Sequence, residues 1–255
     1  MNDQNIYTGR NSQIGQYLPD TLNYISYDIK DETTWGFLAN TKNLFLIIPK
    51  IPHVLEHCKN FIYTAKQAGV KKIVKIGSLG SWRVIHNQLD VYIRDCGINC
   101  ISFDMSVLMN NIFTEQYIGT TLLNYRHDTP APYLDPKALA DAIEQAMNRE
   151  ALLNFNIKAT GRFQYSIEEV RDILELNGYT VKGIETIHNN QLHKNAGVSA
   201  DQRLMSNISD DYALGIYPLI STDLNMFGVT SRSLEQFVAE DAQYYTNLQA
   251  GDKNL

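Results

Sequence analysis

Short apolar runs alternate with amphipathic stretches through the first half of the chain. The runs at 43–49, 71–77 and 98–104 predict buried strands. Before them, 23–31 predicts a strand that ends in acidic residues, and 32–42 predicts a helix. The stretches at 53–69 and 86–97 carry apolar residues at helical spacing, and each ends at a glycine, which commonly terminates helices. Strands that alternate with helices in this way predict an α/β fold, in which helices cover both faces of a doubly wound parallel sheet.

The second half contains clear signals for the starts of helices. Asp135 before Pro136 is an N-cap followed by a residue suited to the first helical position. Ser166 and Glu169 form a capping-box pattern at the start of another helix. After about Ile187 the pattern gives no clear element until the last helix. Helices are therefore expected over 135–150, 166–178 and 231–248, and strands over 152–160 and 179–187.

Two domains that pack together are expected, because no stretch rich in Gly, Ser or Pro separates the halves. The first is a shortened Rossmann-like domain over residues 1–128. The second is a smaller α/β domain over residues 129–255. The strand near 153–159 is a candidate to rejoin the first sheet. A cleft between the domains is the expected place for a small-molecule ligand.

Composition and charge exclude several classes of protein. With 28 acidic and 22 basic side chains and no basic cluster, the chain is a poor candidate for direct binding of nucleic acid. The longest apolar run, LFLIIP, is too short to cross a bilayer. The three cysteines form no C-x-x-C pair and no secretory signal is evident, which favours reduced thiols in the cytoplasm. We expect no membrane partner, and a homodimer is a candidate assembly.

The segment NIYTGRNSQIG, residues 5–15, has the outline of a phosphate-binding loop. A short strand runs into Gly9, and Gly15 follows. Such loops usually carry three glycines, because the backbone must approach the pyrophosphate closely. Ser12 stands at the middle position, where its Cβ hinders that approach and its hydroxyl is a candidate donor to a phosphate. The loop is therefore either a working nucleotide site or the vestige of one.

Five segments, in order, resemble those of the NmrA-like atypical short-chain dehydrogenases/reductases. They are DIKDETTWGFLANTKNLFLIIP, AKQAGVKKIVKIGS, HNQLDVYIRDCGINCISFDMSVLMNN, PYLDPKALADAIEQAM and SRSLEQFVAED, and the resemblance covers nearly the whole chain. It implies a Rossmann fold with an NAD(P) site. By resemblance, Gly9, Ser12, Gly15 and Pro49 stand at cofactor-binding positions, and Asn111 lies near the substrate.

The chain departs from this family after the glycine loop. Pro19 ends the first helix after about two turns, since the residue before a proline is driven out of the helical region. About one βα unit of the sheet is then missing. In one alternative, 23–28 is the second strand and Asp28 binds the adenosine ribose about 20 residues after the loop. In the other, which we favour, the ribose-binding strand is deleted, this segment is the third strand, and Asp28 lies near the adenine.

Candidate acid/base residues are sparse. The Tyr–Lys pair that short-chain dehydrogenases usually use for proton transfer is absent after KIGS. By resemblance to related members, His86 stands at the Lys position, and Asp90 follows one helical turn later. Because an imidazole titrates near neutral pH, His86 with Asp90 is the catalytic candidate. The alternative is a histidine on an exposed helix face, partnered by Asp90.

Polar side chains follow the strands at 71–77 and 98–104, at the carboxyl edge where open α/β sheets bind ligands. No G-x-S-x-G motif surrounds a serine there, which argues against a hydrolase. The family often carries Arg at the position of Asp104, so by resemblance this acid changes which ligand is tolerated; the alternative is a helix N-cap. The residues expected to line the substrate cleft are Ser78, Ser81, Trp82, Asp104 and Asn111.

The segment HVLEH, residues 53–57, matches the zinc-protease spacing H-x-x-E-H. Two histidines at this spacing can share a metal ion. The segment follows Pro52, however, and the sequence offers no evident third ligand. We therefore expect no metal site.

These features lead to one leading hypothesis and two alternatives. The leading hypothesis is an enzyme related to the NmrA-like reductases that binds a small apolar or aromatic metabolite. Its dinucleotide site is eroded, it uses no cofactor, and its chemistry is non-redox, such as cyclisation, isomerisation or elimination. The first alternative is an NAD(P)H-dependent oxidoreductase. The second is a non-catalytic regulator of the NmrA type.

Overall fold

A parallel sheet forms the centre of the molecule. The computed structural model describes residues 4–80, 82–124, 129–186 and 220–249. Within these residues five parallel strands pair in the order β1-β2-β3-β4-β7. The Rossmann-like α/β fold predicted from the alternation of strands and helices is confirmed. The strands are β1 (Asn5–Tyr7), β2 (Asn43–Leu46), β3 (Lys72–Ser78), β4 (Asn99–Met105) and β7 (Phe155–Ala159).

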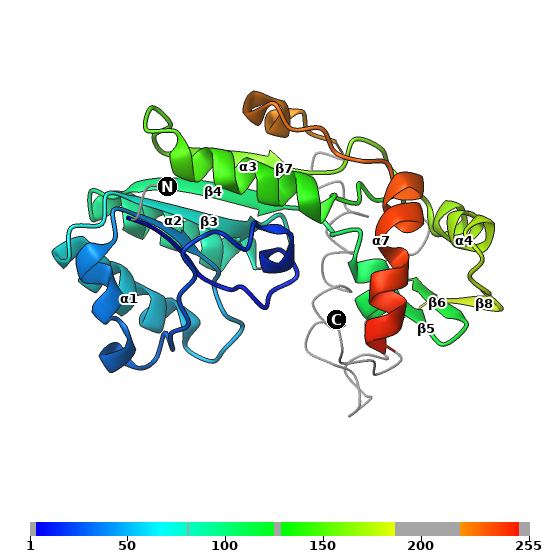
Figure 1. Ribbon diagram of the computed structural model, residues 1–255, viewed down its shortest axis with the longest axis horizontal. Coiled ribbons are helices and arrows are strands. Elements are labelled where there is room, and N and C mark those ends of the chain that lie inside the picture. The colour runs from blue at the N-terminus through cyan, green and yellow to red at the C-terminus, as the bar shows by residue number, and fades with distance from the viewer. Residues whose placement is uncertain (1–3, 81, 125–128, 187–219, 250–255) are drawn as a thin grey trace.

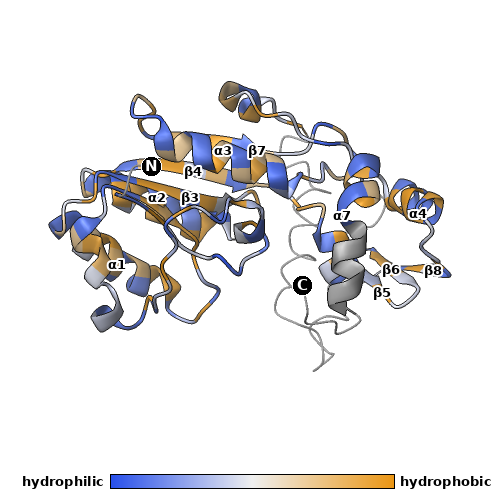
Figure 2. Cartoon of the chain, in the orientation of Figure 1, coloured by the Kyte–Doolittle hydropathy of each residue, from blue (hydrophilic) through white to orange (hydrophobic). Residues whose placement is uncertain are grey.

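Helices cover both faces of this sheet (Figure 1). Helices α1 (Val54–Gln67) and α2 (Arg83–Asp95) pack on one face, and α3 (Pro136–Asn148) packs on the other. Successive residues of a strand point to opposite faces, so Val74 joins the α3 core whereas Ile73 joins the core under α1 and α2. Figure 2 shows the strands β3 and β4 as largely hydrophobic, while the helices carry both hydrophobic and polar positions.

Strand β7 lies at one edge of the sheet although it follows α3 in sequence. It pairs with β4 in parallel, and Ile157 stands opposite Phe103. Both side chains are buried in the core under α3. The strand near 153–159, which the sequence offers as a candidate to rejoin the first sheet, therefore does so, and the division of the chain at residue 128 stays a prediction.

A smaller sheet has its own hydrophobic core, which Phe113, Val170 and Phe237 help to form. The expected capping box is present, because the Ser166 hydroxyl accepts from the Glu169 N–H and the Glu169 carboxylate accepts from the Ser166 N–H. The elements of this part are β5 (Tyr117–Ile118), β6 (Thr121–Asn124), β8 (Gly183–Thr186), α4 (Ile167–Leu176) and α7 (Leu234–Gln249), with β5, β6 and β8 forming the sheet.

The segment between the loop and β2 differs most from prediction. The expected two-turn helix is the single 3-10 turn η1 (Gly15–Tyr17). The expected strand at 23–31 forms only an isolated parallel bridge between Tyr24 and Tyr7. The expected helix at 32–42 is two 3-10 turns, η2 (Glu32–Thr34) and η3 (Gly36–Asn40).

Local side-chain hydrogen bonds explain why this segment is not regular. The Asp31 carboxylate accepts from the Thr33 N–H at 3.0 Å and from the Thr33 hydroxyl at 2.7 Å. The Thr34 hydroxyl donates to the Asp31 carbonyl at 2.7 Å. Such bonds offer the backbone an alternative to the helical ladder. The Trp35 ring then fixes the segment, since it is buried edge-on against Phe61 of α1.

Residues 187–219, where the sequence pattern gives no clear element, lie outside the described residues. Among the helices that the structure describes, none is long and apolar enough to span a membrane.

Candidate functional site

Two cavities lie along the carboxyl edge of the large sheet. The first, called here the apolar cavity, has a volume of about 280 Å³, and its walls include Ile14, Ile76 and Val107. The second, called the polar cavity because it is the more polar of the two, has a volume of about 760 Å³ and is lined by Thr8–Ser12, Tyr24–Lys30 and neighbouring residues. Ser12 and Ile47 line both cavities. The two cavities therefore meet at the glycine loop.

The glycine loop is a closed turn that needs both of its glycines. Gly9 has a positive φ of 71°, which a residue with a side chain rarely adopts. A methyl group at Gly15 would overlap the carbonyl oxygen of Gly9, so any larger residue there would open the turn.

Ser12 closes this turn. Its N–H donates to the Gly9 carbonyl at 2.9 Å, and its hydroxyl oxygen accepts from the Gly15 N–H at 3.0 Å. Among the described residues, the backbone N–H groups of Asn11, Gln13 and Ile14 donate to no protein acceptor. The turn can therefore offer several N–H donors to an anion, as phosphate-binding loops do.

Arg10 is fixed beneath the loop. Its guanidinium donates to the carbonyls of Gly15 at 2.7 Å and Leu18 at 3.3 Å, and it pairs with Asp20. It also lies 5.1 Å from the centre of the Tyr24 ring. These contacts hold the turn closed and occupy the guanidinium group of Arg10.

Asp28 and Pro49 both line the polar cavity. The segment leading to Asp28 lies directly beside β1, because the Tyr7 N–H donates to the Asn23 carbonyl and the Ile25 N–H donates to the Tyr7 carbonyl. This is the place of a second strand. Within the described residues only one segment borders β1 on this side, which fits both alternatives, so the choice between a second and a third strand stays a prediction.

His86 lies in the wall of the apolar cavity, one helical turn after Trp82 on the same face of α2. Its side chain is buried, with 7% exposed, and Nδ1 has no hydrogen-bond partner among the described residues. Burial, and then the nearby Lys75 ammonium, lower the pKa of the imidazole to about 3. The imidazole is therefore neutral at physiological pH. The sequence-based argument for His86 assumed that its imidazole titrates near neutral pH, and that assumption is wrong. A catalytic role for His86 stays a prediction.

Asp90 does not partner His86, contrary to the sequence-based alternative. Its carboxylate lies 2.7 Å from the Lys75 ammonium, and both side chains are buried at 2% and 0% exposure. It also accepts from Asn156 at 2.9 Å. Asp90 is not among the residues that line the apolar cavity. The structure therefore does not bring the predicted acid/base pair together.

Asp104 lies behind the cavity wall rather than in it. Its carboxylate accepts from the Ser102 hydroxyl at 3.0 Å, and burial raises its pKa above the ordinary value. A methyl group at Gly77 would overlap the Asp104 carboxylate. Because Asp104 lies within β4, it is not a helix N-cap either. Gly77 itself does line the apolar cavity, so Asp104 supports the wall from behind.

The remaining predicted substrate residues divide into two groups. Ser78, Trp82 and Asn111 line the apolar cavity. The Ser78 hydroxyl also accepts from the Gly80 N–H at 2.9 Å, which shapes the turn before α2. Ser81 lies outside the described residues.

Sequence reasoning missed Glu115 and Lys75. Glu115 lines the apolar cavity from the π-helical turn η4 (Ile112–Gln116), which follows an irregular segment and carries no sequence signal. Lys75 had a signal, because it is a charged residue inside the apolar run KIVKIG.

The HVLEH segment does not form a compact metal site in the described residues. His53 precedes α1 with a positive φ of 56°, and His57 lies on the helix. Among the described residues, no three His, Cys, Asp or Glu side chains gather where they could hold a metal ion.

Known proteins with this fold hold nicotinamide dinucleotides. A triphenylmethane reductase from Citrobacter sp., crystallised with NADP(H), has a TM-score of 0.75 at 15% identity, over 92% of this chain and 98% of its own. An NADPH-dependent quinone oxidoreductase from Escherichia coli, complexed with NADPH, has a TM-score of 0.76 at 16% identity, over 95% and 100%. The Bordetella bronchiseptica enzyme WbmH, in complex with NAD⁺, has a TM-score of 0.64 at 12% identity, over 95% and 98%.

No family model and no curated protein sequence matches the chain. At such low identity the likeness to solved structures establishes the Rossmann-type fold alone. It nevertheless corrects the leading expectation that the site takes no cofactor. Proteins of the same fold, matched over almost their whole length, bind NADP(H) or NAD⁺. A nucleotide-free site is therefore no longer the leading interpretation.

Proposed function

We propose that the chain is an NAD(P)H-dependent oxidoreductase that acts on a small apolar or aromatic substrate. The observation that carries this proposal is that the polar and apolar cavities meet at the glycine loop. A dinucleotide has the same division, with a polar adenosine end, a central pyrophosphate and a nicotinamide ring. When bound, such a group supplies or accepts a hydride.

The loop fits the pyrophosphate. The N–H groups of Asn11, Gln13 and Ile14 are the candidate donors, and Ser12 can add its hydroxyl proton, since its oxygen already accepts from the Gly15 N–H. Ser12 thus stabilises the turn instead of blocking it. Arg10 lines the polar cavity, and its contacts with the Gly15 and Leu18 carbonyls and with Asp20 compete with a phosphate for its guanidinium.

Asp28 would select the nucleotide at the other end. Its Oδ1 accepts from the Lys30 N–H at 2.9 Å, which leaves Oδ2 available toward the polar cavity. A carboxylate in this place hydrogen-bonds a ribose 2′-hydroxyl and repels a 2′-phosphate. We therefore expect NADH to bind more tightly than NADPH, and Asp28→Ala to reduce that preference in a calorimetric titration with each nucleotide. An unchanged preference would remove Asp28 from the site.

In the apolar cavity, His86 would hold the substrate by hydrogen bonding rather than by supplying a proton. The neutral imidazole offers one N–H donor and one acceptor. Trp82, the N-cap residue of α2, provides an aromatic wall one turn before His86. Most of the exposed lining of this cavity is apolar, which favours a largely apolar substrate, although Lys50 and Glu115 also stand in its wall.

The resemblance of five segments to the NmrA-like reductases agrees with this proposal. That family includes members without the Tyr–Lys pair, in which hydride geometry replaces acid catalysis. The test is turnover of a panel of aromatic carbonyl compounds and quinones, followed by loss of NAD(P)H absorbance. Turnover that falls in His86→Ala and Trp82→Ala supports the proposal. Nucleotide binding without turnover of any compound would favour a non-catalytic regulator instead.

A further inference from the structure

The glycine loop lacks the support that a full helix would give it. Only η1, a three-residue 3-10 turn that begins at Gly15, precedes the point where the chain turns away at Leu18 and Pro19. A longer helix would pack along the sheet and fix the loop at its end. Contacts from elsewhere in the molecule must therefore hold this short turn in position.

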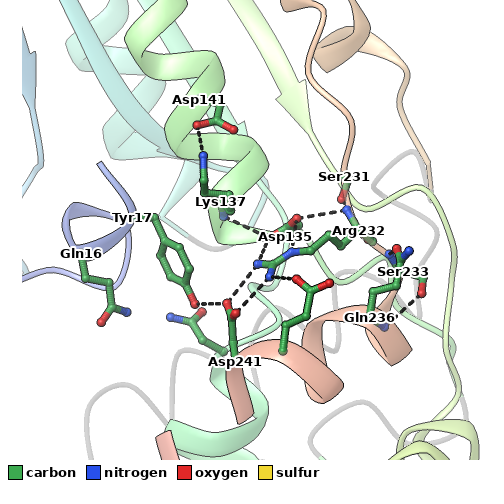
Figure 3. A network of polar contacts seen from close by, with 12 residues as sticks. Gln16, Tyr17, Asp135, Lys137, Asp141, Ser231, Arg232, Ser233, Gln236 and Asp241 are labelled. Atoms are coloured by element: carbon green, nitrogen blue, oxygen red, sulfur yellow. Dashed lines mark hydrogen bonds and ion pairs between the residues drawn. The ribbon is translucent and has the colours of Figure 1, made fainter. Parts of the chain in front are cut away.

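Tyr17, the last residue of η1, reaches across to α7. Its hydroxyl donates to Asp241 Oδ2 at 2.9 Å, although 224 residues separate the two in sequence (Figure 3). The Tyr17 ring packs against both the core under α3 and the core of the smaller sheet. The loop is thus tied to the last helix by one hydrogen bond to a charged acceptor.

Asp241 is itself held by Arg232. The two guanidinium nitrogens Nη1 and Nη2 each donate to one Asp241 carboxylate oxygen at 3.0 Å. Nη1 also donates to Glu240 at 2.9 Å. This two-point contact fixes the orientation of the Asp241 carboxylate that receives the Tyr17 hydroxyl.

Asp135 anchors Arg232 to the large sheet's helix α3. Its Oδ1 accepts from Arg232 Nη2 at 2.9 Å, and its Oδ2 accepts from Nε at 3.0 Å. Oδ1 also accepts from the Lys137 N–H, so Asp135 is the N-cap of α3 as predicted. The Asp135 side chain is 1% exposed. The network therefore runs from the buried start of α3 to the turn that follows the glycine loop.

A second contact ties the loop to the segment that carries Asn111 and Glu115 of the apolar cavity. Gln13 Nε2 donates to the Thr114 hydroxyl at 3.2 Å, and the Gln13 carbonyl accepts from Asn110 Nδ2 at 3.5 Å. The first contact is exposed and the second is long, so both are weaker than the Tyr17 contact. Of these two contacts, the one made by Tyr17 is consequently the stronger.

We propose that Tyr17, Asp241 and Arg232 are positioning residues of the dinucleotide site, which hold the glycine loop in the shape that receives a pyrophosphate. The inference rests on the proposed function. The network takes the place of the helix that would otherwise support the loop. It also links the nucleotide site to α7, so that loosening the network at α7 weakens nucleotide binding from a distance.

The test compares two Tyr→Phe variants that each lose a hydroxyl bonded to a carboxylate of α7. Tyr17→Phe loses the bond to Asp241 and keeps its packed ring. Tyr165→Phe is the matched control, because its hydroxyl donates to Glu235 at 3.2 Å and accepts from the Leu234 N–H at 3.0 Å, away from the loop. NADH affinity is measured by calorimetry, and stability by thermal unfolding, for wild type and both variants.

The expected result is that Tyr17→Phe binds NADH about tenfold more weakly, the loss expected for a hydrogen bond to a charged group that orders the loop. Tyr165→Phe should unfold at a lower temperature with unchanged NADH affinity. Once a substrate that the enzyme turns over is known, Tyr17→Phe should raise the KM for NADH and leave kcat unchanged. Asp241→Asn should weaken NADH binding as well. The double variant Tyr17→Phe/Asp241→Asn should bind NADH no more weakly than Asp241→Asn alone.

The outcomes separate this inference from the function on which it rests. Wild-type binding with equal affinity in Tyr17→Phe would overturn the positioning role alone. Equal losses of affinity in Tyr17→Phe and Tyr165→Phe would also overturn it, because stability would then explain both. No binding of NADH or NADPH by the wild type would overturn the proposed function and this inference with it.

Discussion

The face of the large sheet under α3 is mostly apolar, whereas the face under α2 buries charges. On the α3 face, β3, β4 and β7 contribute Val74, Phe103 and Ile157 to one continuous core. Lys72 is also buried there, but its ammonium donates to carbonyls at the C-terminal end of α3, at 2.8 to 3.1 Å, and so caps that helix. This face therefore serves packing.

The α2 face carries the Lys75–Asp90 ion pair and the Asp104 carboxylate in place of apolar side chains. Lys75 also donates to the Ser102 hydroxyl, which in turn donates to Asp104, each at 3.0 Å. A buried ion pair rarely stabilises a fold more than apolar residues of the same size would. Here it lies behind Gly77 and His86, both of which line the apolar cavity. The difference between the two faces indicates that the α2 face is adapted to the site.

The largest effect should come from breaking the ion pair on one side only. Lys75→Met leaves the Asp90 carboxylate buried without its cation, which should lower the free energy of unfolding by about 3–5 kcal/mol. Urea unfolding followed by circular dichroism measures the change. The double variant Lys75→Met/Asp90→Asn should recover most of the loss. A double variant as unstable as the single one would contradict the assignment of the cost to an unpaired charge.

A somewhat smaller effect should follow from creating a cavity on the α3 face. Ile157→Ala removes buried methyl groups without leaving a polar group unpaired, and should cost about 2–5 kcal/mol. The milder Ile157→Val should cost about 0.5–1.5 kcal/mol in the same unfolding experiment. If both substitutions cost the same, the α3 face would not be closely packed, and the contrast between the two faces would weaken.

The smallest of the three effects should come from a pH change of one unit. The pKa of His86 is lowered to about 3 in the folded protein, so the unfolded chain binds more protons between that value and about 6.5. The stability that neutral His86 contributes is therefore present above about pH 6.5 and lost as pH falls, by about 1.4 kcal/mol per unit. Unfolding at several pH values should show this dependence, and His86→Gln should lack it. The same slope in both proteins would mean that His86 titrates normally.

The sequence pattern predicted the elements from β2 to α3 correctly, because these elements have strong local signals. The buried run at β2, the amphipathic α1 and α2, and the capped α3 each combine periodicity with an end signal. The region from Gly15 to Thr41 has weaker signals. There the hydrogen bonds of Asp31 and Thr33 and the packing of Trp35 on Phe61 decide the backbone, and these contacts are not visible in local patterns.

The candidate site was predictable in outline only. The carboxyl edge of the sheet pointed to Ser78 and Trp82, and both line one cavity together with His86 and Asn111, whose places were suggested by the family resemblance. The roles of these residues stay predictions. The protonation state of His86 could not be read from sequence, because it depends on burial and on Lys75 from another strand. The role of Ser12 also needed the structure, since only the turn shows its hydroxyl accepting from the Gly15 N–H.

The central claim is that the loop between the two cavities still binds a dinucleotide. Calorimetric titration of the wild type and of Gly15→Ala with NADH and NADPH tests it most directly, with circular dichroism to confirm that both proteins are folded. The account predicts saturable binding to the wild type and its loss in Gly15→Ala, because the added methyl group forces the turn open. Absence of saturable binding to the folded wild type by either nucleotide would contradict it.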